Sequence, residues 1–272
     1  MAMQLGLQVW QYILIGVVGG NALYAGLGGL VHWWYYRRNR EHSRRWKIQP
    51  ERFLAKRLDR EAMWLGLFNF NLATVVMATL AWGVFEHGWS RLYFDFSAYG
   101  WDYTLLSLFL CWLFIEAAAY YMHAGGHLPW FYKRFHHIHH RYSTPTFWTI
   151  SAMHPLEWIA HASYIALPAF IIPMHIGVYM TVVGMTFVLG YWDHCGIKFP
   201  RIPLHGSNKF HDDHHKYFHV NFGFTCSLFD RLHDTARREG HHYDELTFNG
   251  GKGRLRKPEA LGEQVQGPLV EY

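Results

Sequence analysis

Cysteine is scarce in this chain. Its 272 residues include only Cys111, Cys195 and Cys226, which are odd in number and far apart. They supply neither a disulfide framework nor a C-x-x-C metal site. The basic start of a cleavable signal peptide is also missing from residues 1–7, so we expect the first apolar run to stay in the mature protein. Any metal site has to be built from other residue types.

Charged residues are also few, at 17% of the chain, and they are unevenly distributed. Although 51% of the residues are hydrophobic, the mean hydropathy is near zero, because long apolar runs alternate with stretches rich in Arg and His. The formal net charge of +5 is concentrated in residues 35–60, which hold ten Arg or Lys and three acids. A basic excess that directly abuts an apolar run indicates membrane topology rather than nucleic-acid binding.

The apolar runs predict an all-α integral membrane protein. We expect spans at about residues 7–34, 63–85 and 103–121, because the hydrocarbon core of a bilayer is about 30 Å thick. The apolar stretch 156–192 is broken by Pro168, Pro173 and His175, which predicts two short helices forming a hairpin that enters and leaves on one side. The predicted fold has about four transmembrane helices, the last pair a hairpin, and a cytoplasmic helical cap.

The distribution of basic residues orients these spans. The connector 86–102 holds a single basic residue, Arg91, and is expected to face away from the cytoplasm. Segments 35–60, 123–153 and 193–272 are then cytoplasmic. We expect a multi-pass protein of the endoplasmic reticulum membrane in a eukaryote, or of the inner membrane in a bacterium. The predicted parts are residues 1–62 with the first span and basic loop, 63–245 as the catalytic membrane domain, and 246–272 as a loosely ordered tail.

Histidine is abundant, with 21 copies. Eight of them form clusters with spacings of three and four, which place the imidazoles of a cluster on one face of a helix, within reach of a metal. The predicted topology puts every cluster on the same side of the membrane. The clusters are His123-x-x-x-His127, His136-x-x-His139-His140 and His211-x-x-His214-His215.

Eight imidazoles are too many for one tetrahedral zinc ion and suit two metals with positions left open. His194, at the end of the last apolar run, is a candidate ninth ligand. Imidazole binds iron, zinc and copper alike, so these ligands do not select the metal. We expect no catalytic residue beyond the metal ligands. The predicted ligands are His123, His127, His136, His139, His140, His194, His211, His214 and His215.

Other residues near the clusters have predicted supporting roles. Carboxylates are expected to orient the imidazoles, and the candidates by adjacency along the chain are Asp193, Asp212 and Asp213. Glu157 and Asp230 are expected to form structural ion pairs or helix caps. His154, which Pro155 follows, is expected to fix the junction where the chain re-enters the membrane. His161 is expected to be an interfacial or packing residue and His205 a surface residue.

With these clusters, the chain resembles the fatty acid hydroxylase superfamily, which includes sterol desaturases and sterol C-4 methyl oxidases. The resemblance covers about residues 103–235. Two positions depart from the superfamily pattern: Ala124 replaces a usual Arg, and Asp234 stands where Gly is expected. Lys47-Ile48-Gln49-Pro50 is similar to a segment of the C-4 methyl oxidase branch. Other similar strings are His154-Pro155-Leu156-Glu157, His194-Cys195-Gly196, Asn221-Phe222-Gly223 and Phe229-Asp230-Arg231 near Thr235.

The resemblance implies a diiron centre that uses dioxygen, with electrons from NAD(P)H passed through a reductase and cytochrome b5 or a similar donor. It implies hydroxylation or desaturation of a lipid, with a sterol favoured and the C-4 methyl group as the favoured carbon. Alternatives within the class are fatty-acyl and sphingolipid hydroxylases. A different class, a His-rich membrane metal transporter, would place its ligands along a path near mid-membrane. A zinc hydrolase would need three ligands and a carboxylate base.

The predicted topology can be tested by cysteine-accessibility labelling in sealed vesicles. Single cysteines introduced into residues 86–102 and into the segment after Asp193 should label from opposite sides, because the basic residues of 35–60 keep the clusters in the cytoplasm. Labelling of both segments from one side would contradict the assignment of spans.

Overall fold

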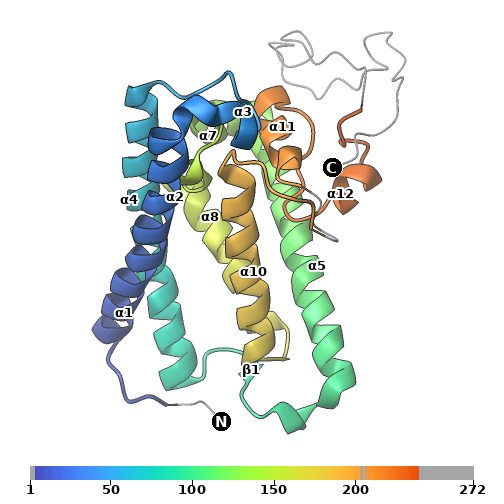
Figure 1. The fold of residues 1–272 in the computed structure, drawn as a ribbon. Coiled ribbons are helices and arrows are strands. Elements are labelled where there is room, and N and C mark those ends of the chain that lie inside the picture. The colour runs from blue at the N-terminus through green and yellow to red at the C-terminus, as the bar shows by residue number, and fades with distance from the viewer. Residues whose placement is uncertain (1–3, 203–204, 206, 239–272) are drawn as a thin grey trace.

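The computed structural model describes residues 4–202, 205 and 207–238. Long helices form a bundle, and short helices and loops form a cap at one end of it (Figure 1). The N-terminal residues of the described chain lie at the opposite end. The predicted tail 246–272 falls outside the described residues.

Four helices in the described part of the chain are long and apolar enough to cross a membrane. The first, Val9–Arg38, is one continuous rod that contains α1, α2 and two π-helical stretches. The protein is therefore a multi-pass membrane protein with helical spans. The bounds of these helices are α1 (Val9–Asn21), α2 (Gly28–His32), α4 (Lys56–His87), α5 (Gly100–Gly126) and α10 (Ile176–His194).

The cap consists of short elements that follow the ends of the long helices. Among them, α7 continues directly from the π-helical stretch Tyr132–His136. The loop after α7 contains the short 3-10 helix Phe147–Ile150. The cap helices are α3 (Ser43–Trp46), α6 (Pro129–Phe131), α7 (His137–His140), α11 (Lys209–Tyr217) and α12 (Leu228–Leu232).

The three predicted spans are confirmed, and their helices extend beyond the apolar runs. The largest consequence is at α5, which continues past the expected end at residue 121 to Gly126. Helical hydrogen bonding continues beyond the point where the hydropathy falls. The helix α5 ends shortly before Pro129, because a proline disfavours the helical conformation of the residue that precedes it. His123 therefore lies on the spanning helix itself rather than after it.

The predicted hairpin over residues 156–192 is present, although α10, with 19 residues, is longer than the short helix expected. α8 (Pro155–Ala166) and α9 (Pro168–Ile171) lead away from the cap, and α10 returns to it. At the tip, β2 (Met174–His175) pairs in parallel with β1 (Leu92–Tyr93). Since β1 belongs to the connector 86–102, the hairpin reaches the end of the bundle opposite the cap (Figure 1).

Polar contacts and small residues hold α1 against α4. The Asn21 side chain donates to the Asn71 side-chain oxygen at 2.7 Å, an interhelical amide contact of the kind that stabilises helix pairs in lipid. At the end away from the cap, the Glu86 carboxylate accepts hydrogen bonds from the backbone of Leu5–Leu7 and from the Tyr12 hydroxyl at 2.7 Å. These contacts fix the first span along the second.

Close approach of the cap loop to α4 depends on Gly66. A Cβ atom at this position would lie 2.7 Å from the Tyr24 hydroxyl and 2.8 Å from the Trp148 carbonyl oxygen. The neighbouring Asn69 side chain donates to the carbonyl oxygens of Ser151 and Met153 at 2.7 and 2.8 Å. This face of α4 therefore positions the loop that precedes α8.

We expect Gly66→Ala to lower the unfolding temperature in detergent, because overpacking a tight contact costs about 1–3 kcal/mol. Gly19→Ala is the matched control, since a Cβ atom at position 19 meets nothing within 4 Å and alanine favours the helix. Thermal unfolding of both variants checks the prediction. An unchanged unfolding temperature for Gly66→Ala would contradict the close approach.

Candidate metal centre

The structure brings all nine predicted histidines together at the cap end of the bundle. His123 and His127 lie at the end of α5, and His194 ends α10. The H-x-x-H-H clusters lie on the stretch from the π-helical turn through α7, and on α11. Four helical segments distant in the sequence therefore meet at one site.

Their nitrogen atoms form two separate groups, and within each group the candidate ligand atoms lie within 4.8 Å of one another. Two groups of this kind match a dinuclear site rather than a single metal. The first group is His123, His127, His136, His140 and His214; the second is His139, His194, His211 and His215.

Each H-x-x-H-H cluster is divided between the two groups. His136 and His140, four residues apart, face the first group, and His139 faces the second. The third cluster is divided in the opposite sense, because His211 and His215 face the second group and His214 the first. Two consecutive residues on a helix, such as those three and four positions after a given residue, point about 100° apart. The histidines of one helix can therefore bind two neighbouring metals.

Backbone carbonyl groups set the orientation of three rings. The Nδ1 atoms of His123, His214 and His194 lie 2.9, 2.7 and 2.8 Å from the carbonyl oxygens of Phe222, Val220 and Gly190, respectively. A ring nitrogen that faces a carbonyl must carry the proton. The Nε2 atom of each ring then has a lone pair that can bind a metal.

The spacing of the Nε2 atoms fits metal coordination. Nε2 of His136 lies 3.1 Å from that of His127 and 3.0 Å from that of His140, and the His194 and His211 pair is 2.9 Å apart. Two nitrogens bound at about 2.1 Å and about 90° apart on one metal are separated by about 3.0 Å.

Burial adds to this fit. Eight of the nine rings are at most 6% exposed, and the Nε2 atoms of His123 and His215 are buried without a hydrogen-bond partner among the described residues. Desolvation keeps such rings neutral, which is the form that binds metals. It lowers the pKa of six rings outside the spans well below the ordinary value: His127, His139, His140, His211, His214 and His215.

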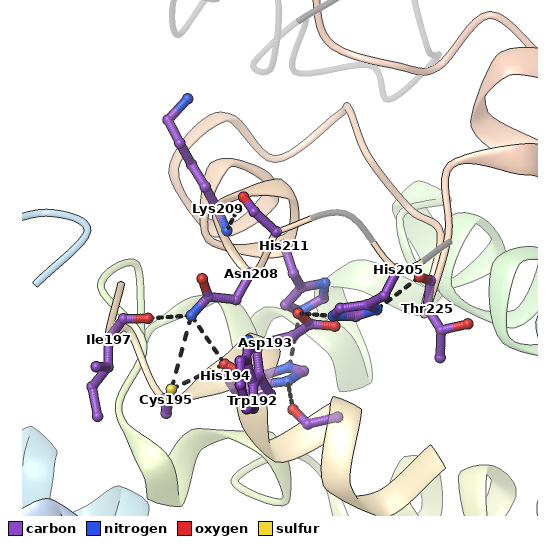
Figure 2. Close-up of polar contacts among 12 residues, drawn as sticks. Trp192, Asp193, His194, Cys195, Ile197, His205, Asn208, Lys209, His211 and Thr225 are labelled. Atoms are coloured by element: carbon purple, nitrogen blue, oxygen red, sulfur yellow. Dashed lines mark hydrogen bonds and ion pairs between the residues drawn. The ribbon is translucent and has the colours of Figure 1, made fainter. Parts of the chain in front are cut away.

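The carboxylates predicted to orient the rings have other partners. Asp193 pairs with His205 at 3.1 Å, Asp212 accepts from the Gln49 side chain at 2.8 Å, and Asp213 pairs with Arg237 at 2.9 Å. Adjacency along the chain was a poor guide, because consecutive residues on a helix point about 100° apart. The prediction that His205 lies at the surface is wrong: its side chain is 5% exposed and lies between Asp193 and Thr225 (Figure 2).

Glu157, in contrast, contacts a candidate ligand through an ion pair with Nδ1 of His136. It lies in the first turn of α8, where Pro155 follows the helix-capping His154. His154 was expected to fix this junction of the chain, and its Nδ1 caps α8 by accepting from the Leu156 backbone at 3.2 Å. The signal that could have identified Glu157 was its place at the start of a helix that begins at the cap.

The sequence strings at residues 221–235 that resemble the superfamily form the loop that orients the rings of His123 and His214. The Asp230 carboxylate accepts from the backbone of Phe222 and Gly223 at 2.8 and 2.7 Å and from the Thr235 hydroxyl at 2.7 Å. This holds the carbonyls that face His123 and His214. Asp234 adopts a φ of +55°, a left-handed conformation that favours glycine, which accounts for the Gly expected at this position.

An apolar cavity of about 870 Å³ extends from the long helices to the histidines. Side chains of α1, α4, α8 and α10 form most of its wall, and rings of both histidine groups, including His123 and His194, close one end. The volume is within the range of about 300–1,000 Å³ that is typical of small-molecule sites. The arrangement can hold an apolar molecule directly against the candidate metals.

A family model for fatty acid hydroxylases matches residues 108–235, which contain all nine histidines. Residues 108–235 belong to the fatty acid hydroxylase family. The fatty acid hydroxylase resemblance is thereby confirmed, and the chain is an oxidoreductase.

Several relatives of this chain carry sterol names. A Δ7-sterol 5(6)-desaturase of Schizosaccharomyces pombe is 29% identical over 205 residues, which cover 72% of this chain and 67% of the relative. Lathosterol oxidase of Rattus norvegicus is 26% identical over 273 residues, 97% of this chain and 85% of the relative. A Δ7-sterol 5(6)-desaturase of Leptosphaeria maculans is 31% identical over 188 residues, 65% and 50% of the two chains. No solved structure matches the chain significantly.

We expect the purified wild-type protein to bind close to two iron(II) ions per chain, and Glu157→Ala to weaken binding at the five-histidine group by about 10- to 100-fold, because it releases His136. Anaerobic iron titration with elemental analysis measures both values.

The control is Glu51→Gln, which removes the charge of an exposed carboxylate that pairs with Arg44. Saturation of folded wild-type protein at one ion would rule out the two-metal site, and unchanged binding by Glu157→Ala would rule out the orienting role.

Proposed function

We propose that this protein is a sterol desaturase that uses two iron ions and dioxygen. The observation that carries the proposal is the apolar cavity whose end is formed by both histidine groups. A lipid in this cavity would present a C–H bond to the metals while the surrounding helices exclude water. The names of the relatives favour a sterol as that lipid and desaturation as the outcome.

The residues have distinct roles in this proposal. The nine histidines hold the two irons, Glu157 and the carbonyls of Val220 and Phe222 fix the orientation of ligand rings, and the cavity wall positions the sterol. The irons would supply the chemistry that uses dioxygen to oxidise the substrate, and the protein supplies ligands, orientation and exclusion of water. The substrate loses two hydrogen atoms as the double bond forms, and reduction of dioxygen to water requires two further electrons.

Those electrons come, in this proposal, from NAD(P)H through a reductase and cytochrome b5 or a similar donor. The cap side is then cytoplasmic, as the basic segment 35–60 predicts. Exposed basic side chains border the cap, among them Arg44, Lys133 and Lys216. They suit the docking of an acidic soluble donor.

The other candidate functions have less support. The Lys47-Ile48-Gln49-Pro50 string, which favoured C-4 methyl oxidation, braces the cap: Lys47 bridges to Ile197, and Gln49 donates to Asp212. It therefore carries little information about the substrate. A fatty-acyl or sphingolipid hydroxylase would use the same ligands. A metal transporter is disfavoured because the candidate ligands form closed groups at one end of the bundle.

We expect the protein, supplied with dioxygen, reduced nicotinamide and an electron-transfer system, to convert a Δ7-sterol into a product lighter by two hydrogen atoms. A 4-methylsterol and a ceramide are assayed separately by mass spectrometry, and a product heavier by one oxygen atom would indicate hydroxylation. His136→Ala, which removes a ligand, should abolish turnover, whereas His42→Ala should leave it unchanged. Turnover of ceramide alone would contradict the sterol assignment and leave the metal site untouched.

A further inference from the structure

Two of the side chains that line the apolar cavity carry a polar atom that makes no hydrogen bond within the described residues. The indole Nε1 of Trp158 and the hydroxyl of Tyr191 are buried, and neither has a hydrogen-bond partner among the described residues. Both side chains line the cavity. A buried polar group without a partner costs about 1–3 kcal/mol, so two at one cavity indicate a ligand that supplies the partners.

His161 adds an acceptor at the same wall. Its Nδ1 lies 2.8 Å from the Glu157 carbonyl oxygen, so Nδ1 carries the proton and Nε2 keeps a lone pair. No hydrogen bond to Nε2 occurs within the described residues, and the ring borders the cavity. His161 was expected to be an interfacial or packing residue, and in the structure it also lines the cavity.

The three side chains lie close together beside the metal centre. Trp158 and His161, three residues apart on α8, have nearly parallel rings with centroids 6.5 Å apart. Tyr191 of α10 packs in one cluster with Trp158 and Met153. One position before Trp158, Glu157 pairs with His136 of the first histidine group. The three side chains therefore line the cavity close to the residue that pairs with the first histidine group.

Their chemistry matches an alcohol. The Trp158 N–H and the Tyr191 O–H can each donate a hydrogen bond, and His161 Nε2 can accept one. A hydroxyl group offers two lone pairs and one proton, which satisfies all three. An ester or ketone oxygen has no proton for His161, and a carboxylate would place a charge in an apolar cavity at high cost.

We propose that Trp158, His161 and Tyr191 form a pocket that binds the hydroxyl group of the lipid substrate. The inference rests on the proposed function and deepens it: the substrate is a sterol with a free 3-hydroxyl group, held with its hydroxyl-bearing end at the metals and its hydrocarbon tail in the rest of the cavity. Oxidation then occurs close to the hydroxyl-bearing ring and not on the tail.

The test is equilibrium binding of a radiolabelled Δ7-sterol with a free 3-hydroxyl and of its 3-deoxy analogue to the full-length, iron-loaded protein in nanodiscs. We expect the wild-type protein to bind the alcohol at least about tenfold more tightly, since one or two net hydrogen bonds correspond to such a factor. Tyr191→Phe should reduce this preference several-fold, and His161→Leu should remove most of it. Iron content confirms that each variant is folded.

Tyr179→Phe is the matched control, because Tyr179 lies on the same helix and its hydroxyl donates to the Ile165 carbonyl at 3.3 Å. It should keep the wild-type preference. Equal affinity of the wild-type protein for both sterols, or a preference that survives in both Tyr191→Phe and His161→Leu, would overturn the hydroxyl pocket. A preference for the alcohol that these variants lose, with no sterol oxidised, would support the pocket and overturn the proposed function.

Discussion

Burial of nine imidazole rings with their ring nitrogens turned toward one another is the constraint on which the rest of the structure depends. Such rings lose their hydration, and two ring lone pairs at about 3 Å repel unless a proton or a metal ion lies between them. The metal ions proposed here remove that repulsion and connect α5, α7, α10 and α11. The six consecutive buried residues of α11, Phe210–His215, are mostly polar, and coordination explains why such a helix can be internal.

A layer of carboxylates supports this centre. Glu157 fixes His136 directly, and Asp230 holds the loop whose carbonyls fix two further rings. Glu116, buried on α5, accepts from the Thr225 backbone at 3.2 Å and attaches the same loop to a spanning helix. At the first cluster, Gly126 leaves room for the His136 ring, because a Cβ atom there would lie 3.2 Å from its Cγ. The positions of His123, His136 and His214 are thus set by contacts outside the ligand set.

The spans and the candidate ligands were predictable because both depend on short-range periodicity. An apolar run of membrane length, or histidines three or four residues apart, can be recognised from a single segment of the sequence. Other features were not predictable, because they depend on residues that only the folded bundle brings together. These features are the pairing of Glu157 with His136, the parallel pairing of Leu92 with Met174, and the burial of His205. The division of each H-x-x-H-H cluster between two groups also depends on how α7 and α11 face each other, which no local pattern encodes.

Because the clusters are interleaved, the order of synthesis limits when the centre can form. A nascent chain that has released α7 but not α10 has four of the five rings of the first group and only one, His139, of the second. The second group needs His194, His211 and His215, which follow the last membrane helix or end it. Both histidine groups are therefore complete only late in synthesis, after the last membrane helix has been made.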